Sequence, residues 1–231
     1  SGDHTLEEAR TYKELAEKNE PPKSYEYRLQ AADLFIAIDY NEEAKQLLQQ
    51  LPNDIDPKFQ EERNVLLAEL SLKARKPHDT IAHLRDITDS NLLSSHYQEK
   101  IFGLKAGAYE QLGEPVKSSE ARAYLDEMLF NAQDKHTNED LLWSNLARAD
   151  VSDLQQYAAS HETTPLSGWV KLALILRTES VGNLSYALDD WRYQFPGHPG
   201  HAYIKSQSES PAAFDKAYPA QIALLLPLSG T

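Results

Sequence analysis

The sequence predicts an all-α protein in which helical hairpins pack one after another along the chain. Three observations favour this fold class: helical periodicity of the apolar residues, frequent helix-start signals, and a recurring spacing of small residues. The periodicity is clearest late in the chain, where Leu184, Leu188 and Trp191 recur at helical spacing. A stripe of this kind buries one face of a helix and leaves the other face in water.

Helix-start signals divide the chain into short helices with short connections. Asp56 and Thr164 each precede a first-turn proline, Thr5 begins a capping-box pattern, and Asn138 precedes an acidic turn. Short connections favour antiparallel neighbours. We expect eleven helices, at residues 5–18, 24–39, 41–51, 57–75, 78–88, 94–112, 115–131, 138–148, 151–160, 165–179 and 183–194.

The small residues recur at a spacing that suggests a structural repeat. Each set consists of a small residue, a second small residue 12 positions later and an aliphatic residue 7 positions after that. The pattern occurs three times, with successive sets 36 and then 38 residues apart. The sets are Ala32, Ala44 and Leu51; Ala68, Thr80 and Ile87; and Ala106, Ser118 and Leu125. This period is close to the roughly 34 residues of a tetratricopeptide repeat. Small side chains let two helices cross closely, which is a physical reason for the spacing. The alternative is coincidence, because alanine is common in any helix.

The end of the chain has a different pattern. After the tetratricopeptide-like repeat domain, 1–195, prolines and glycines predict an irregular linker over 196–218. Residues 219–231 contain a continuous apolar run, which is typical of a strand buried on both faces. We therefore expect this stretch to be the first strand of a missing α/β domain, and we interpret Ser1 and Gly2 as a cloning remnant.

Composition excludes several classes of function. The net charge is −13, which disfavours binding to nucleic acid or to anionic membrane surfaces. The chain has no cysteine, so disulfides, thiolate metal sites and cysteine catalysis are excluded. Twelve tyrosines against six phenylalanines favour an interaction surface, although tyrosines also suit partly buried helix pairs.

No motif in the sequence indicates catalysis or cofactor binding. His161 is not followed by the second histidine of a zinc-protease helix, and His198 and His201 lack an obvious third metal ligand nearby. Acidic pairs such as Glu61 and Glu62 are explained by the helix dipole. We expect no enzyme activity and assign no catalytic, cofactor-binding or metal residue; the residues that contact a partner remain unknown. Trp169 and Trp191 are expected in the core, and Trp143 either in the core or inside a curved solenoid.

The last forty or so residues carry a resemblance to a known family. Helical hairpins are followed by a helix end, Phe195-Pro196-Gly197-His198-Pro199, and then by the apolar run from Ala220 to Gly230. This order resembles the amino-terminal domain of the LpoA family of penicillin-binding-protein activators of Gram-negative bacteria. The final stretch resembles the opening strand of that family's carboxy-terminal domain, which is similar to periplasmic substrate-binding proteins.

The resemblance implies a non-catalytic regulator of peptidoglycan synthesis. It would be an outer-membrane lipoprotein on the periplasmic side, anchored by a lipid on an N-terminal cysteine that this sequence lacks. Its partner would be a class A penicillin-binding protein. The carboxy-terminal domain would make the principal contact, and the helical domain would act as a spacer with a second interaction surface. No cofactor is implied.

Two other functions stay open. The chain could be a helical accessory domain of a peptidoglycan-cleaving or other periplasmic enzyme, whose catalytic part would lie beyond it. It could also be a repeat domain that binds an extended peptide in its concave groove, with affinity weakened by salt if acidic residues take part.

Overall fold

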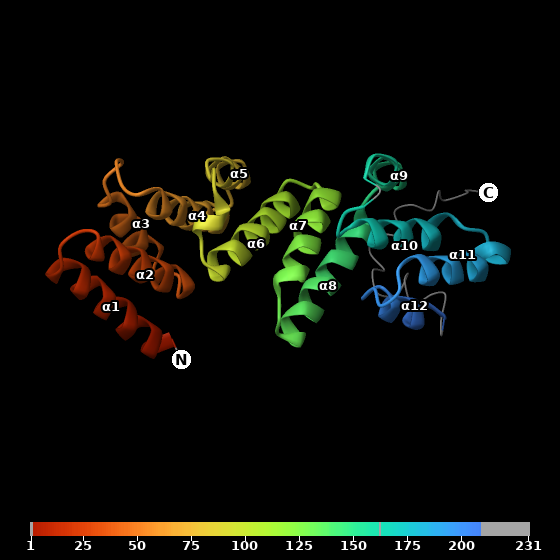
Figure 1. Cartoon of the computed structure of the whole chain (residues 1–231), viewed down its shortest axis with the longest axis horizontal. Helices are drawn as coiled ribbons and strands as arrows, with labels where there is room; N and C mark the ends of the chain where they lie inside the picture. The colour runs from red at the N-terminus through yellow and green to blue at the C-terminus, as the bar shows by residue number, and fades with distance from the viewer. Residues whose placement is uncertain (1, 162, 209–231) are drawn as a thin grey trace, which may run out of the picture. The chain divides into compact units, whose positions relative to one another are not determined.

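The computed structural model describes residues 2–161 and 163–208, and these residues form helices joined by turns and short loops (Figure 1). The described residues contain no strand, so the all-α prediction is confirmed for them. The predicted strand at 219–231 lies outside the described residues. The chain divides into two compact units, Ser1–Leu112 and Gly113–Thr231, whereas the sequence suggested one repeat domain over 1–195. No helix in the described ranges is both long and apolar enough to cross a membrane.

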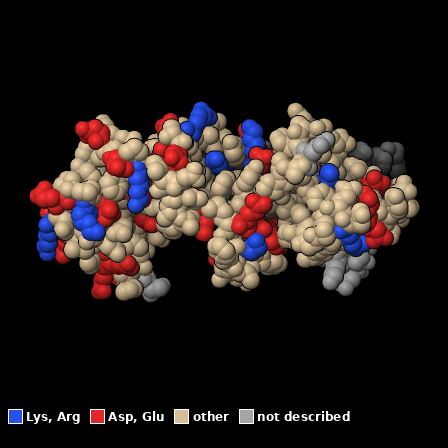
Figure 2. All heavy atoms as spheres, viewed as in Figure 1, with Lys and Arg blue, Asp and Glu red and all other residues tan. Residues whose placement is uncertain are grey.

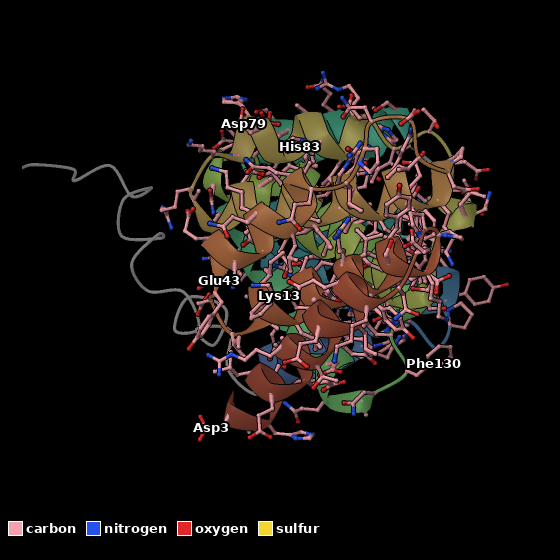
Figure 3. All side chains as sticks on the ribbon, turned by 90° about the vertical axis from the view of Figure 1, so that its left-hand side faces the viewer. Asp3, Lys13, Glu43, Asp79, His83 and Phe130 are labelled. Atoms are coloured by element: carbon pink, nitrogen blue, oxygen red, sulfur yellow. The ribbon has the colours of Figure 1, made fainter. Side chains whose placement is uncertain are left out.

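The first unit consists of helical hairpins. Its helices are α1 (Gly2–Lys18), α2 (Lys23–Ala37), α3 (Asn41–Gln49), α4 (Pro57–Lys73), α5 (Pro77–Arg85), the 3-10 helix η1 (Ser90–Leu92) and α6 (Ser95–Gln111). Helix α2 packs against α1 and α3, and α4 packs against α2, α5 and α6. Helices α2, α4 and α6 follow one another, with α3 and α5 on one side of them (Figure 1). Figure 3 shows Asp79 and His83 of α5 at the opposite edge of this unit from Asp3 of α1.

The small residues predicted at the hairpin crossings are buried. Ala32 on α2 and Ala44 on α3 are fully buried, as are Ala68 on α4 and Thr80 on α5. The hydroxyl of Thr80 forms a hydrogen bond of 2.9 Å with that of Ser71, so this buried polar residue has a partner. Close approach of the paired helices therefore depends on the side chains that the repeat predicts.

The turns repeat with the same period as the small residues. Asp39 after α2 has a φ of 63°, Arg75 after α4 has a φ of 58°, and Gly113 after α6 has a φ of 70°. These three residues are 36 and then 38 positions apart, which matches the spacing of the small-residue sets. A left-handed residue is a common way to end a helix, and glycine adopts it at the lowest cost.

The second unit is held together by aromatic side chains. Its helices are α7 (Pro115–Met128), α8 (Ala132–Arg148), α9 (Val151–Ser160), α10 (Ser167–Thr178), α11 (Val181–Gln194) and α12 (His201–Ser208). Helix α8 packs against α7 and α10, and α10 also packs against α9 and α11. Trp169 and Trp191 are in the core, as predicted, and Trp143 belongs to the same core because it packs against Trp169 and Tyr203.

Helix α12 corrects part of the linker prediction. Residues 201–208 are helical, although the prolines and glycines of 196–218 predicted irregular structure there. Ile204 is fully buried in the core of the second unit, and Tyr203 packs against Trp143 and Trp169. These contacts stabilise a helix that local propensity does not favour.

Of the predicted helix starts, the cap at Asp56 is confirmed, because its side chain accepts a hydrogen bond from the Lys58 amide. Three other predicted starts are wrong. Helix α1 begins at Gly2, so Thr5 is inside it and cannot cap it. Helix α8 begins at Ala132 and is capped by Asn131, while Asn138 is buried and donates to the Arg122 carbonyl. Helix α10 begins at Ser167, because residues 163–166 form a turn instead of a first helical turn.

Candidate functional site

Helices α2, α4 and α6 present a network of charged side chains on one common face. The ammonium of Lys100 on α6 lies 2.7 Å from a carboxylate oxygen of Glu69 on α4 and 3.2 Å from one of Asp33 on α2. The other oxygen of Asp33 lies 2.8 Å from Nε2 of His96, also on α6. One lysine thus joins three helices. We call this surface the α2–α4–α6 face and define it by these residues: Glu26, Asp33, Glu62, Glu69, His96, Tyr97 and Lys100.

The four carboxylates of this face form two rows that run across the helices. One row consists of Glu26 and Glu62, and the other consists of Asp33 and Glu69. Glu26 precedes Asp33 by seven residues on α2, and Glu62 precedes Glu69 by seven residues on α4. Seven residues are about two helical turns, so each pair lies on one side of its helix. Lys100 forms ion pairs with both carboxylates of the row of Asp33 and Glu69. Two turns before Lys100 the chain has Leu93, which precedes α6 and is buried in the core, so α6 supplies no cation to the row of Glu26 and Glu62.

Glu62 is a largely buried residue whose carboxylate oxygens still contact water and have no hydrogen-bond or ion-pair partner among the described residues. Its residue is 9% exposed. Burial raises its pKa above the ordinary value, the nearby carboxylates of Glu26 and Asp33 raise it further, and Lys58 opposes the shift. Buried charges are normally paired, because removal from water is costly. Glu62 is therefore the member of this row without an ion pair among the described residues, whereas Glu26 pairs with Lys23.

Two other groups of this face respond to its carboxylates. Tyr97 is buried, and burial together with Asp33, Glu62 and Glu69 raises the pKa of its phenol. Burial alone would lower the pKa of Lys100, but Glu69 and Asp33 raise it above the ordinary value. Acidic and basic side chains are interspersed over the first unit in Figure 2. The face is suited to positively charged ligands at the row of Glu26 and Glu62, and it holds a tyrosine that stays protonated.

A second feature is a recess of about 460 Å³ in the second unit, between the start of α7 and helix α9. Its wall includes Glu120, whose carboxylate accepts a hydrogen bond of 2.6 Å from the Tyr157 hydroxyl. The Tyr157 ring stacks on the His161 ring with centroids 4.1 Å apart. Asp153 also lines the recess. The volume is within the range of small-molecule sites.

Ser160 and His161 lie next to each other in this recess, and both are also close to backbone carbonyls. The Ser160 hydroxyl lies 2.8 Å from the Gln156 carbonyl, to which it donates. His161 Nδ1 lies 2.9 Å from that hydroxyl and 3.2 Å from the Tyr157 carbonyl. When its single proton is donated to the Gln156 carbonyl, the Ser160 hydroxyl can accept from His161 Nδ1, and the tautomer of His161 decides which of the two groups donates.

The two histidines considered as metal ligands are partly buried and pack against the core residue Trp191. His198 packs edge-on against Trp169 and Trp191, and its Nδ1 accepts a hydrogen bond from the Gly200 amide. Burial, with a contribution from His201, lowers the pKa of His198 to about 4. His201 Nε2 lies 2.9 Å from the Phe195 carbonyl. No group of three metal-ligating side chains occurs among the described residues.

The sequence analysis missed the charged face, although a signal for it exists. Glu61 and Glu62 were explained by the helix dipole, yet Glu61 is buried and accepts hydrogen bonds from the amide and hydroxyl of Thr88. Glu26 and Glu62 are 36 residues apart, and so are Asp33 and Glu69. Acidic residues that recur with the repeat period fall on equivalent positions of stacked hairpins.

The described part of the chain is thus an all-helical hairpin protein with a charged face shared by three helices and a small acidic recess. The chain belongs to the family described as "LppC putative lipoprotein", which it matches over residues 4–231. It is therefore a member of a lipoprotein family, and the resemblance noted in the sequence is confirmed.

Curated relatives carry the name "Penicillin-binding protein activator LpoA". The relative from Photobacterium profundum is 33% identical over 140 residues, which are 60% of this chain and 23% of that protein. The relative from Pasteurella multocida is 26% identical over 212 residues, which are 90% of this chain and 36% of that protein. The chain thus spans roughly a quarter to a third of the length of these relatives.

Solved structures confirm the fold. The chain is similar to the amino-terminal domain of LpoA from E. coli, with a TM-score of 0.64 and 20% identity over 84% of this chain and 86% of that one. It is also similar to the LpoA amino-terminal domain from Haemophilus influenzae, with a TM-score of 0.61 and 21% identity over 94% of each chain. At this identity the likeness establishes a shared all-helical fold.

Proposed function

We propose that this chain is the helical interaction part of an activator of a class A penicillin-binding protein and has no catalytic activity of its own. The observation that carries the proposal is membership of the lipoprotein family, together with relatives named as activators that match up to 90% of the chain. The whole protein would be anchored by a lipid to the outer membrane and would face the periplasm, where peptidoglycan is built.

The described geometry supports a binding role. Ser160 and His161 lie 2.9 Å apart, but the Ser160 hydroxyl donates to the Gln156 carbonyl. Hairpins packed in series expose a large surface for their mass, and the α2–α4–α6 face offers charged groups on three successive helices. Such a face suits protein contact better than it suits bond cleavage, because it has no nucleophile paired with a base.

The proposal is tested by measuring glycan polymerisation and cross-linking by a class A penicillin-binding protein from the same bacterium. Adding the whole protein should raise the rate of the synthase. The whole protein without its synthase should release no product from lipid-linked precursor or from purified peptidoglycan. An unchanged synthase rate, or cleavage of peptidoglycan by the protein alone, would contradict the proposal and favour an accessory domain of a cleaving enzyme.

A further inference from the structure

Lys100 shows how the α2–α4–α6 face binds a cation. Its ammonium lies between carboxylates on two helices, Asp33 at 3.2 Å and Glu69 at 2.7 Å. Lys100 and both of its partners are about one-fifth exposed, so the pairs are shielded from water and worth more than surface ion pairs. The protein therefore contains a working example of an ammonium site made by α2 and α4.

The same two helices repeat this arrangement two turns earlier without the cation. Glu26 and Glu62 have the same 36-residue separation as Asp33 and Glu69, and they lie on the same sides of α2 and α4. Helix α6 begins at Ser95 and does not reach this level. Glu62 is 9% exposed, and its carboxylate oxygens contact water and have no hydrogen-bond or ion-pair partner among the described residues.

The cations already near this row do not complete it. Lys23 pairs with Glu26 at 3.2 Å, but both side chains are largely exposed, and such pairs contribute little. Lys58 is exposed one turn before Glu62, where it attracts the carboxylate without forming an ion pair in the described structure. Both lysines can swing into solvent when a better-placed cation arrives.

We propose that Glu26 and Glu62 form a binding site for a lysine side chain of a partner protein, equivalent to the site that Asp33 and Glu69 form for Lys100. Tyr97 is buried, and it is close enough to Glu62 for that carboxylate to raise the pKa of its phenol. A net charge of −13 on the chain also favours a basic partner segment. The inference rests on the proposed function only in assigning the lysine to a protein.

The test uses the whole chain and two short acetylated peptides, one in which lysine alternates with glycine and one in which glutamine replaces lysine. Calorimetric titration at low salt should show saturable binding of the lysine peptide and none of the glutamine peptide. The E26Q/E62Q double variant should bind about fivefold more weakly or worse, because both carboxylate charges are lost. Amide chemical shifts should change around Glu26, Glu62 and Tyr97.

The matched control is E42Q/E43Q, which removes two exposed carboxylates from α3 and lowers the net charge equally. It should bind the lysine peptide like the wild type. Equal weakening by both double variants, shift changes centred on the recess between α7 and α9, or no saturable binding would overturn the proposal. If E26Q/E62Q unfolds, the single variant E26Q at the less buried position gives the same comparison. The peptides do not involve the synthase, so failure of the activator assay leaves this result standing.

Discussion

The ammonium of Lys100 on α6 and the carboxylate of Asp33 on α2 form an ion pair of 3.2 Å, although α4 is the helix that packs directly against both α2 and α6. This pair, with Glu69 as its third member, links three successive helices of the first unit. The network therefore contributes both to the stability of the hairpin stack and to the charge pattern of its face.

Replacing Lys100 by Met should destabilise the first unit. Two partly buried carboxylates would lose their shared cation, and we expect a loss of about 1–3 kcal/mol in the free energy of unfolding. The measurement is urea denaturation of K100M. The control K117M removes a lysine from an exposed pair with Glu114 and should change stability by less than about 0.5 kcal/mol. Equal effects of the two variants would show that the network is not stabilising.

Replacing a glycine inside α6 and the glycine just after α6 by alanine should change the free energy of unfolding in opposite directions. Gly113 has a φ of 70°, so G113A should cost about 1 kcal/mol. Gly103 is inside α6, and an added Cβ would meet nothing within 4 Å, so G103A should stabilise by about 0.5–1 kcal/mol. Thermal unfolding of both variants tests this. If G113A stabilised the protein, Gly113 would not have the left-handed backbone conformation described here.

Glu62→Gln should stabilise the protein at neutral pH and lose this advantage in acid. The pKa of Glu62 is raised in the folded state by burial and by the carboxylates of Glu26 and Asp33. The protonated side chain therefore stabilises the fold below about pH 4.5. This stability is lost as the pH rises through the raised pKa. Gln never ionises. Melting temperatures at about pH 7.5 and pH 4 should therefore differ from wild type only at the higher pH. E42Q, an exposed control, should show no pH-dependent difference, and a destabilised E62Q at neutral pH would contradict the account.

His198 should make the second unit sensitive to acid. Because burial lowers the pKa of this histidine to about 4, the stability that its neutral form provides is present above about pH 6.5 and is lost as pH falls toward 4. The loss should be on the order of 2 kcal/mol. H198N should abolish that part of the pH dependence in urea denaturation. The exposed control H78N should keep it, and an unchanged pH slope in H198N would refute the role of His198.

The sequence was sufficient for most helices because local signals and tertiary packing agree there. Asp56 caps α4, and the buried Ala32 and Ala68 recur at the repeat spacing, so periodicity and capping led to the same elements. Helix α12 could not be predicted in this way. It depends on the burial of Ile204 in the core of the second unit, which no local pattern reveals.

The charged face required knowledge of how the helices stack. Neither Asp33 nor Lys100 is unusual in its own helix, and their contact depends on the relative positions of α2 and α6. The start of α8 was missed for a related reason. Asn131 looked like the last residue of one helix, whereas its side chain caps the next by accepting from the amides of Gln133 and Asp134.

The most direct test of the account is hydrogen exchange of the whole protein, measured with and without the extracytoplasmic part of the class A penicillin-binding protein that we propose as its partner. We predict slower amide exchange in α2, α4 and α6 when the partner is bound, because the α2–α4–α6 face would then be covered. A stable complex that leaves exchange in these three helices unchanged would contradict the claim that this face is an interaction surface.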